Sequence, residues 1–139
     1  MTGNSKQVDL EKYAVFVDGV TSNPSKDYKS FLDSIEYLDG EGSNIQRLLT
    51  AAVGISAEGG EFMEIVKKMV FQGKPWNDDN REHLIIELGD VMWYVMQACK
   101  ALDVSLDEVI AGNVEKLKKR YPGGDFDVYH SENRAADDR

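Results

Sequence analysis

Two couples of acidic residues, Glu58 with Glu61 and Glu87 with Asp90, lie inside strongly apolar stretches of this 139-residue chain. Residues three apart share one face of a helix, so each couple presents two carboxylates in one direction. An ionised carboxylate in apolar surroundings must be compensated, and a divalent cation is the simplest compensation. The two couples therefore favour a fold in which two helices face each other across a site.

The remaining sequence predicts helices and no sheet. No stretch alternates strictly between apolar and polar residues, whereas apolar residues recur at helical spacing along most of the chain. Three capping-box patterns, which begin at Ser43, Asp79 and Ser105, indicate helix starts. The expected helices span residues 6–20, 28 to about 40, 43 to about 72, 79 to at least 96, and 105–120. The predicted fold class is all-α, a helical bundle with a four-helix-type core.

Length and composition indicate one domain of an ordinary globular kind. A chain of this length with 42% hydrophobic residues can bury a substantial core, so residues 1–139 are expected to form a single domain. The segment from about residue 130 to 139 is polar and cannot bury enough apolar area to offset its ordering entropy. We expect this tail to be mobile.

Charge and cysteine content exclude several classes of function. A net charge of −9 leaves no basic surface for a phosphodiester backbone, which argues against a nucleic-acid partner. The single cysteine, Cys99, excludes a disulfide framework and a thiolate zinc site, and its apolar helical context predicts a small core residue. No apolar run reaches the length of a membrane span, and no export signal is recognisable, so we expect a cytoplasmic protein without a membrane partner.

The ligand types in the couples predict a hard metal. Four carboxylates without cysteine or a suitably spaced histidine make an all-oxygen site, which favours Mg²⁺ or Mn²⁺ over zinc or copper. A di-iron bundle would need Glu-x-x-His pairs, but the residue three before His83 is Asn80. Gly59 and Gly60, which are costly inside a helix, predict close approach of a neighbouring helix or a ligand.

The alternative interpretation places the acids on solvated helix faces or in ion pairs with Lys67, Lys68 and Arg81. An isolated Glu-x-x-Glu usually has that role. The second couple favours function, because the apolar residues of the segment 84–96 leave hardly any solvent-facing side for it. Glu64 fits a fifth ligand and an ordinary exposed residue equally well.

Three segments in a fixed order carry a resemblance to a known family: residues 57–61, 87–94 and 113–122. Over about residues 43–122, the sequence resembles the MazG-like branch of the all-α nucleoside triphosphate pyrophosphohydrolases. The order of the segments is more specific than any one of them. The family pattern, Glu-x-x-Glu followed after a spacer by Glu-x-x-Asp, is complete in this chain.

The resemblance implies a helical subunit that assembles as a homodimer or homotetramer. It also implies a Mg²⁺ site, in which Mn²⁺ is possible, held by Glu58, Glu61, Glu87 and Asp90. The implied reaction converts a nucleoside triphosphate to the monophosphate and pyrophosphate. Residues 1–42 lie outside the resemblance and are interpreted as accessory N-terminal helices.

Roles for individual residues follow from the chemistry of metal-assisted hydrolysis. Metal ions would neutralise charge on the triphosphate and activate a water, with Glu61 or Glu64 as the general base. Lys116 and Arg120 lie four residues apart on the last helix, three and seven residues after Asn113, so these three are candidates to contact phosphates. Basic residues in a last helical turn also complement the helix dipole, and this interpretation is equally good for Lys118 and Lys119, whereas the resemblance favours phosphate contact for Lys116 and Arg120.

The base pocket is less clearly encoded. Trp76, in a loop, is a candidate to stack on the base, and Asn44 and Gln46 are candidates to contact its edge. Trp93 and Tyr94 are expected to pack in the core. Two other functions stay open, namely a catalytically silent helical module that only oligomerises and the same chemistry on another diphosphate-containing compound. Buried unpaired carboxylates would be costly for the silent module.

Overall fold

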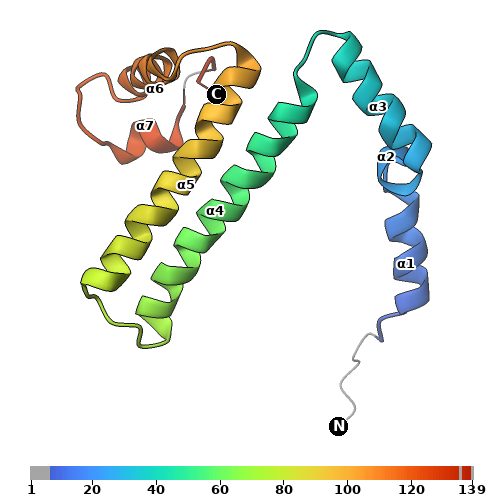
Figure 1. Ribbon diagram of the computed structural model, residues 1–139, viewed down its shortest axis with the longest axis horizontal. Coiled ribbons are helices and arrows are strands. Elements are labelled where there is room, and N and C mark those ends of the chain that lie inside the picture. Colours follow the sequence, from blue (N-terminus) through green and yellow to red (C-terminus); the bar gives the residue numbers. More distant parts are fainter. Residues whose placement is uncertain (1–6, 135, 139) are drawn as a thin grey trace. The chain divides into compact units, whose positions relative to one another are not determined.

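The structure is a computed structural model that describes residues 7–134 and 136–138. Its described residues form helices and no strand, which confirms the all-α class (Figure 1). The helices are α1 (Leu10–Gly19), α2 (Asn23–Lys26), α3 (Tyr28–Gly40), α4 (Ile45–Phe71), α5 (Asp78–Leu102), α6 (Leu106–Arg120) and α7 (Val128–Glu132).

The chain groups into two units, one up to Ser43 and one from Asn44 onward. The first unit holds α1, α2 and α3, none of which has a buried residue. The second unit holds α4 to α7 and all of the site residues proposed from the sequence. The division falls next to residue 43, where the expected catalytic core begins, while the single-domain organisation stays a prediction.

The starts of α4 and α5 differ from the predicted capping boxes. Asn44, and not Ser43, caps α4 by accepting from the backbone N–H of Arg47 at 3.3 Å. The Ser43 hydroxyl instead donates to the carbonyl of Leu38 at 2.6 Å and so closes the turn after α3. Two adjacent residues could cap this helix, and the path of the preceding turn selects the second.

The start of α5 is displaced in a similar way. Asn77 caps α5 by accepting from the backbone N–H of Asn80 at 2.9 Å, so Asp79 lies in the first turn, where its charge complements the helix dipole. The predicted start of α6 at Ser105 is confirmed. Ser105 accepts from the backbone N–H of Glu108 at 3.1 Å and donates to its carboxylate at 3.3 Å.

The core of the second unit lies between α4 and α5, which run side by side (Figure 1). Gly54 of α4 meets the ring of Tyr94 of α5, where an added Cβ would lie 2.0 Å from the Tyr94 Cδ1 atom. A larger residue at this position would therefore force the helices apart. Cys99 is buried and unpaired, as expected for a small core residue.

Gly59 and Gly60 do not serve the close helix approach expected of them within this chain. No atom of the described neighbours lies within 4 Å of a Cβ built at either residue. The contact that requires glycine lies earlier in α4, at Gly54. The open space at Gly59 and Gly60 leaves room for another molecule on this stretch of α4.

Among the described helices, none combines the length and the apolar character that crossing a membrane requires.

Candidate metal centre

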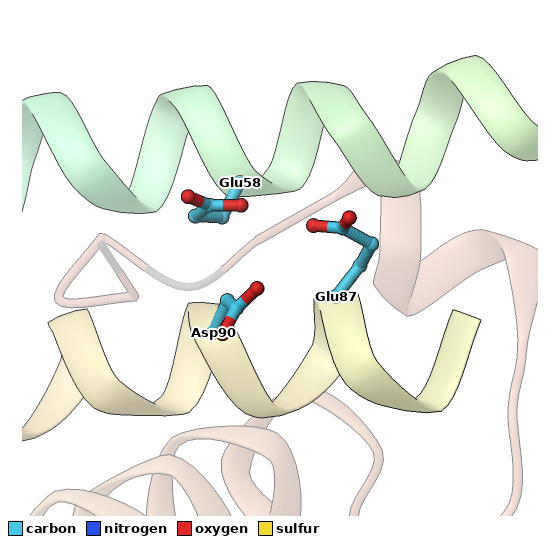
Figure 2. Close-up of side chains that lie close together, drawn as sticks. All are labelled: Glu58, Glu87 and Asp90. Carbon is cyan, nitrogen blue, oxygen red and sulfur yellow. The ribbon is translucent and has the colours of Figure 1, made fainter. Parts of the chain in front are cut away.

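Three of the four predicted acids meet between α4 and α5. Glu58 of α4 points toward Glu87 and Asp90 of α5 (Figure 2). One carboxylate oxygen from each lies within 4.8 Å of the others. The i, i+3 spacing directs Glu87 and Asp90 to the same side of α5, and the pairing of the helices brings Glu58 opposite them. Three converging carboxylates are a donor set that suits a hard divalent cation.

Glu87 has the most restrictive surroundings of the three acids. It is 9% exposed, and its Oε2 atom is buried without a hydrogen-bond partner among the described residues. Burying an anionic oxygen without a partner costs free energy, and a positive charge next to this atom would offset that cost. The trio therefore fits a divalent cation on its own geometry.

The pKa of Glu58 is also consistent with crowded negative charge. It lies above its ordinary value, first because a proton shared with the neighbouring Glu87 would form a hydrogen bond. Burial and the negative charges of Asp90, Glu87 and Glu61 raise the pKa of Glu58 further. A cation bound between these groups would remove the repulsion.

Glu61 and Glu64 lie outside the trio. The charge of Glu61 is close enough to raise the pKa of Glu58, although no oxygen of Glu61 joins the cluster. Glu64 instead pairs with Lys67 at 3.2 Å and with Lys68 at 3.5 Å. The hydrogen bond from Lys67 is the main reason that the pKa of Glu64 lies below its ordinary value. Its contacts are those of a partly exposed surface acid paired with lysines of its own helix.

A pocket of about 310 Å³ adjoins the trio and is lined by Glu58, Asp90, Trp93 and Tyr94. The Trp93 ring is edge-on to that of Tyr94, with centroids 4.9 Å apart, and Trp93 is 58% exposed. The prediction that Trp93 only packs in the core is wrong for the described chain. Its position three residues after Asp90, on the same side of α5, is the sequence signal that places it beside the acids.

The other base-contact candidates lie away from the trio within one chain. Trp76 is 68% exposed and lies in the loop after α4, and the last residue of that helix is roughly 20 Å along the helix axis from Glu58 at about 1.5 Å per residue. Asn44 and Gln46 lie about as far in the other direction, where they line a separate pocket of about 310 Å³. The side-chain oxygen of Asn44 is already used as the cap of α4.

Two of the three phosphate-contact candidates hold a carboxylate. Arg120 donates from Nε and Nη2 to Asp138 at 2.8 and 3.0 Å, and the Lys116 ammonium lies 4.0 Å from the same carboxylate. The Asp138 side chain is only 2% exposed, and the hydrogen bond from Arg120 holds its pKa below the ordinary value. Asn113 is exposed on the same helix. Asp138 belongs to the segment expected to be mobile, and that mobility stays a prediction.

His83 is a further residue that touches the trio. Its Nε2 atom lies 3.2 Å from Oε1 of Glu87, and Glu87 follows His83 by one turn of α5. His83 was not among the candidate residues, although its position four residues before Glu87 predicts this contact.

Comparison with known proteins matches the stretch that holds these residues. The model of the MazG nucleotide pyrophosphohydrolase domain matches residues 46–124, which include the four predicted acids and α6. A Mycobacterium phage L5 protein called Gene 37 protein is 39% identical over 87 residues, which cover 61% of this chain and 75% of the phage protein. No solved structure matches the chain.

Proposed function

Because this chain belongs to the MazG nucleotide pyrophosphohydrolase domain family, we propose that it hydrolyses ribo- or deoxyribonucleoside triphosphates to the monophosphate and pyrophosphate. The proposed cofactor is Mg²⁺, or Mn²⁺, held by Glu58, Glu61, Glu87 and Asp90. The observation that carries the proposal is the convergence of three carboxylates from two helices on one point, where a buried oxygen of Glu87 has no hydrogen-bond partner among the described residues.

The roles of the acids follow from this arrangement. When bound, a divalent cation would neutralise charge on the triphosphate and lower the pKa of an attacking water. Glu58, Glu87 and Asp90, whose oxygens converge between α4 and α5, would hold the cation, with Glu61 next to them on α4 as the fourth proposed ligand. No covalent intermediate is required, because hydrolysis by an activated water needs no serine or cysteine nucleophile.

Glu61 is the better candidate for the residue that orients or deprotonates the water. A general base must accept a proton, and the lysines beside Glu64 depress its pKa and make it a weaker base. Glu61 has the trio as its electrostatic neighbour, since its charge affects Glu58. Glu64 remains the alternative base if its lysine contacts open when substrate binds.

We assign the triphosphate to Asn113, Lys116 and Arg120 on α6. Arg120 already binds a carboxylate with two hydrogen bonds, and the same fork matches the oxygens of a phosphate. Asp138 therefore occupies the guanidinium group of Arg120, which the proposal assigns to the substrate phosphates. Substrate and Asp138 cannot both take these hydrogen bonds, so the two are expected to compete.

The variant Asp138→Asn should lower the KM for the triphosphate by about threefold or more and leave kcat unchanged. The reason is that the apparent affinity rises when the binding-competent form is populated more often. Steady-state kinetics at fixed ionic strength measures both constants. Asp137→Asn is the matched control, because Asp137 pairs with Lys119 at 3.6 Å and not with Arg120. An unchanged or increased KM for Asp138→Asn would contradict the competition.

We also propose that the functional unit is a homodimer or homotetramer. Four apolar residues of α5 are 41–54% exposed: Ile85, Leu88, Met92 and Met96. Their spacing places them on one face, which we call the α5 stripe, on the side of the helix away from Glu87 and Asp90. Burying such a stripe is the main favourable term in subunit association. A second copy would complete a four-helix-type core.

The same assembly would give the remaining base candidates a role. Trp76, Asn44 and Gln46 are far from the trio of their own chain, so contact with the base would have to come from a neighbouring copy. Trp93, which borders the pocket beside Asp90, is the stacking candidate within one chain.

The experiment for the proposed function is hydrolysis of a panel of ribo- and deoxyribonucleoside triphosphates with Mg²⁺, with Mn²⁺ and with EDTA. Products are resolved by anion-exchange chromatography. We expect monophosphate and pyrophosphate with either metal and no product with EDTA, and the rates rank the bases and sugars. No turnover of any nucleotide with either metal would count against the proposal and favour a silent oligomerisation module or a different diphosphate-containing substrate.

A further inference from the structure

His83 and Glu87 form a contact that the proposed mechanism does not yet use. The His83 Nε2 atom lies 3.2 Å from Oε1 of Glu87, and both residues belong to α5, whose backbone fixes their separation. His83 is half exposed, whereas the Glu87 side chain is 12% exposed. The histidine therefore reaches the acid from the solvent side of the site.

The two oxygens of Glu87 have different surroundings. Oε1 faces His83, while Oε2 is buried and has no hydrogen-bond partner in the described parts of the chain. Figure 2 shows the carboxylate of Glu87 turned toward Glu58 across the helix pair. A hydrogen bond to one oxygen limits rotation of the carboxylate and leaves the other oxygen free for a ligand bond. Groups that orient metal ligands commonly act in this way.

We propose that His83 is a positioning residue: its Nε2 atom, 3.2 Å from Oε1 of Glu87, donates to that oxygen when the ring turns toward it and thereby holds Oε2 toward the cation. This inference rests on the proposed metal site. Both the imidazolium and the neutral tautomer with hydrogen on Nε2 can donate this bond, so the role does not depend on the charge of His83.

An ordinary surface pair of residues four apart would behave differently. Such a pair contributes a little to helix stability, and its loss does not change the affinity of a metal site. A direct ligand would be different again, because it would need a nitrogen atom bonded to the metal. Measurements of metal affinity on variants that keep or remove the hydrogen-bond donor separate the three roles.

The experiment is calorimetric titration of Mn²⁺ alone into the wild-type protein, His83→Ala and His83→Gln, with helix content followed by circular dichroism. The glutamine amide can donate the same hydrogen bond but carries no imidazole nitrogen. His130→Ala is the matched control, because His130 also contacts a carboxylate, that of Asp127, which lies outside the acidic trio.

We expect His83→Ala to raise the Kd for Mn²⁺ about tenfold, His83→Gln to stay within about threefold of wild type, and His130→Ala to leave the Kd unchanged. Equal Kd values for His83→Ala and wild type would overturn the positioning role. Equal weakening by His83→Ala and His83→Gln would also overturn it and would indicate a direct ligand. Absence of Mn²⁺ binding by the wild-type protein would instead overturn the metal site itself.

Discussion

The variant Asp90→Asn is expected to lose nucleotide hydrolysis by at least about a thousandfold while its helix content stays that of the wild type. The substitution keeps the size of the side chain and removes one of the three converging negative charges. Metal-bound charge stabilisation is among the largest contributions to phosphoryl-type hydrolysis, so the loss of a ligand charge falls mainly on the reaction. Asp90 is exposed, so its replacement leaves no buried polar group unsatisfied.

Two measurements complete this test. Turnover of the preferred triphosphate gives the activity, and far-ultraviolet circular dichroism gives the helix content. Glu82→Gln is the matched control, because Glu82 is an exposed acid of the same helix outside the trio. Near-normal activity of Asp90→Asn would remove the metal-site hypothesis, whatever the Glu82 variant does. A comparable loss in Glu82→Gln would indicate a general effect of charge on α5.

The periodicity of apolar residues alone is sufficient to predict the all-α class and the approximate positions of the long helices. The apolar spacing that predicted helices before Gly73 and after Asn77 matches α4 and α5. The same argument put Glu87 and Asp90 on one side of α5. Local rules are reliable here because each depends only on residues within one or two helical turns.

The helix starts show where local rules reach their limit. Ser43 and Asn44 are both good caps, as are Asn77 and Asp79 in principle, so composition cannot choose between them. The turn after α3 decides the first case, because it uses the Ser43 hydroxyl for the carbonyl of Leu38. A choice of this kind depends on the path of the chain before the helix.

Contacts between distant segments were not predictable from pattern. The pairing of Arg120 with Asp138 spans 18 residues and depends on how the chain returns after α7. The exposure of Trp93 depends on which faces of α5 are covered, and apolar spacing gives the same signal for a core residue and for an uncovered one. Sequence spacing therefore predicted that Glu87 and Asp90 share one side of α5, and it did not predict that Trp93 is exposed beside them.

Introduction of a charge into the α5 stripe is expected to dissociate the assembly. In the variant Leu88→Lys, an ammonium would replace a leucine that is 54% exposed in the single chain and that we place at the contact with a second copy. Burying an unpaired charge costs several kcal/mol. In a two-fold interface both copies carry the substitution, so this cost arises twice. We expect the Kd for self-association to rise by at least about a thousandfold, since each 1.4 kcal/mol is a factor of ten.

Sedimentation velocity over a range of protein concentrations measures this change. Leu88→Met is the matched control, because it keeps an apolar side chain of similar volume at the same position and should retain the wild-type oligomer. A wild-type protein that is already monomeric, or a Leu88→Lys variant with an unchanged oligomeric state, would contradict the stripe as an interface. We also expect dissociation to lower thermal stability. In the described single chain, the only buried hydrophobic residues are Ala51, Ile65 and Cys99, so we expect the apolar core to depend on contacts with a second copy.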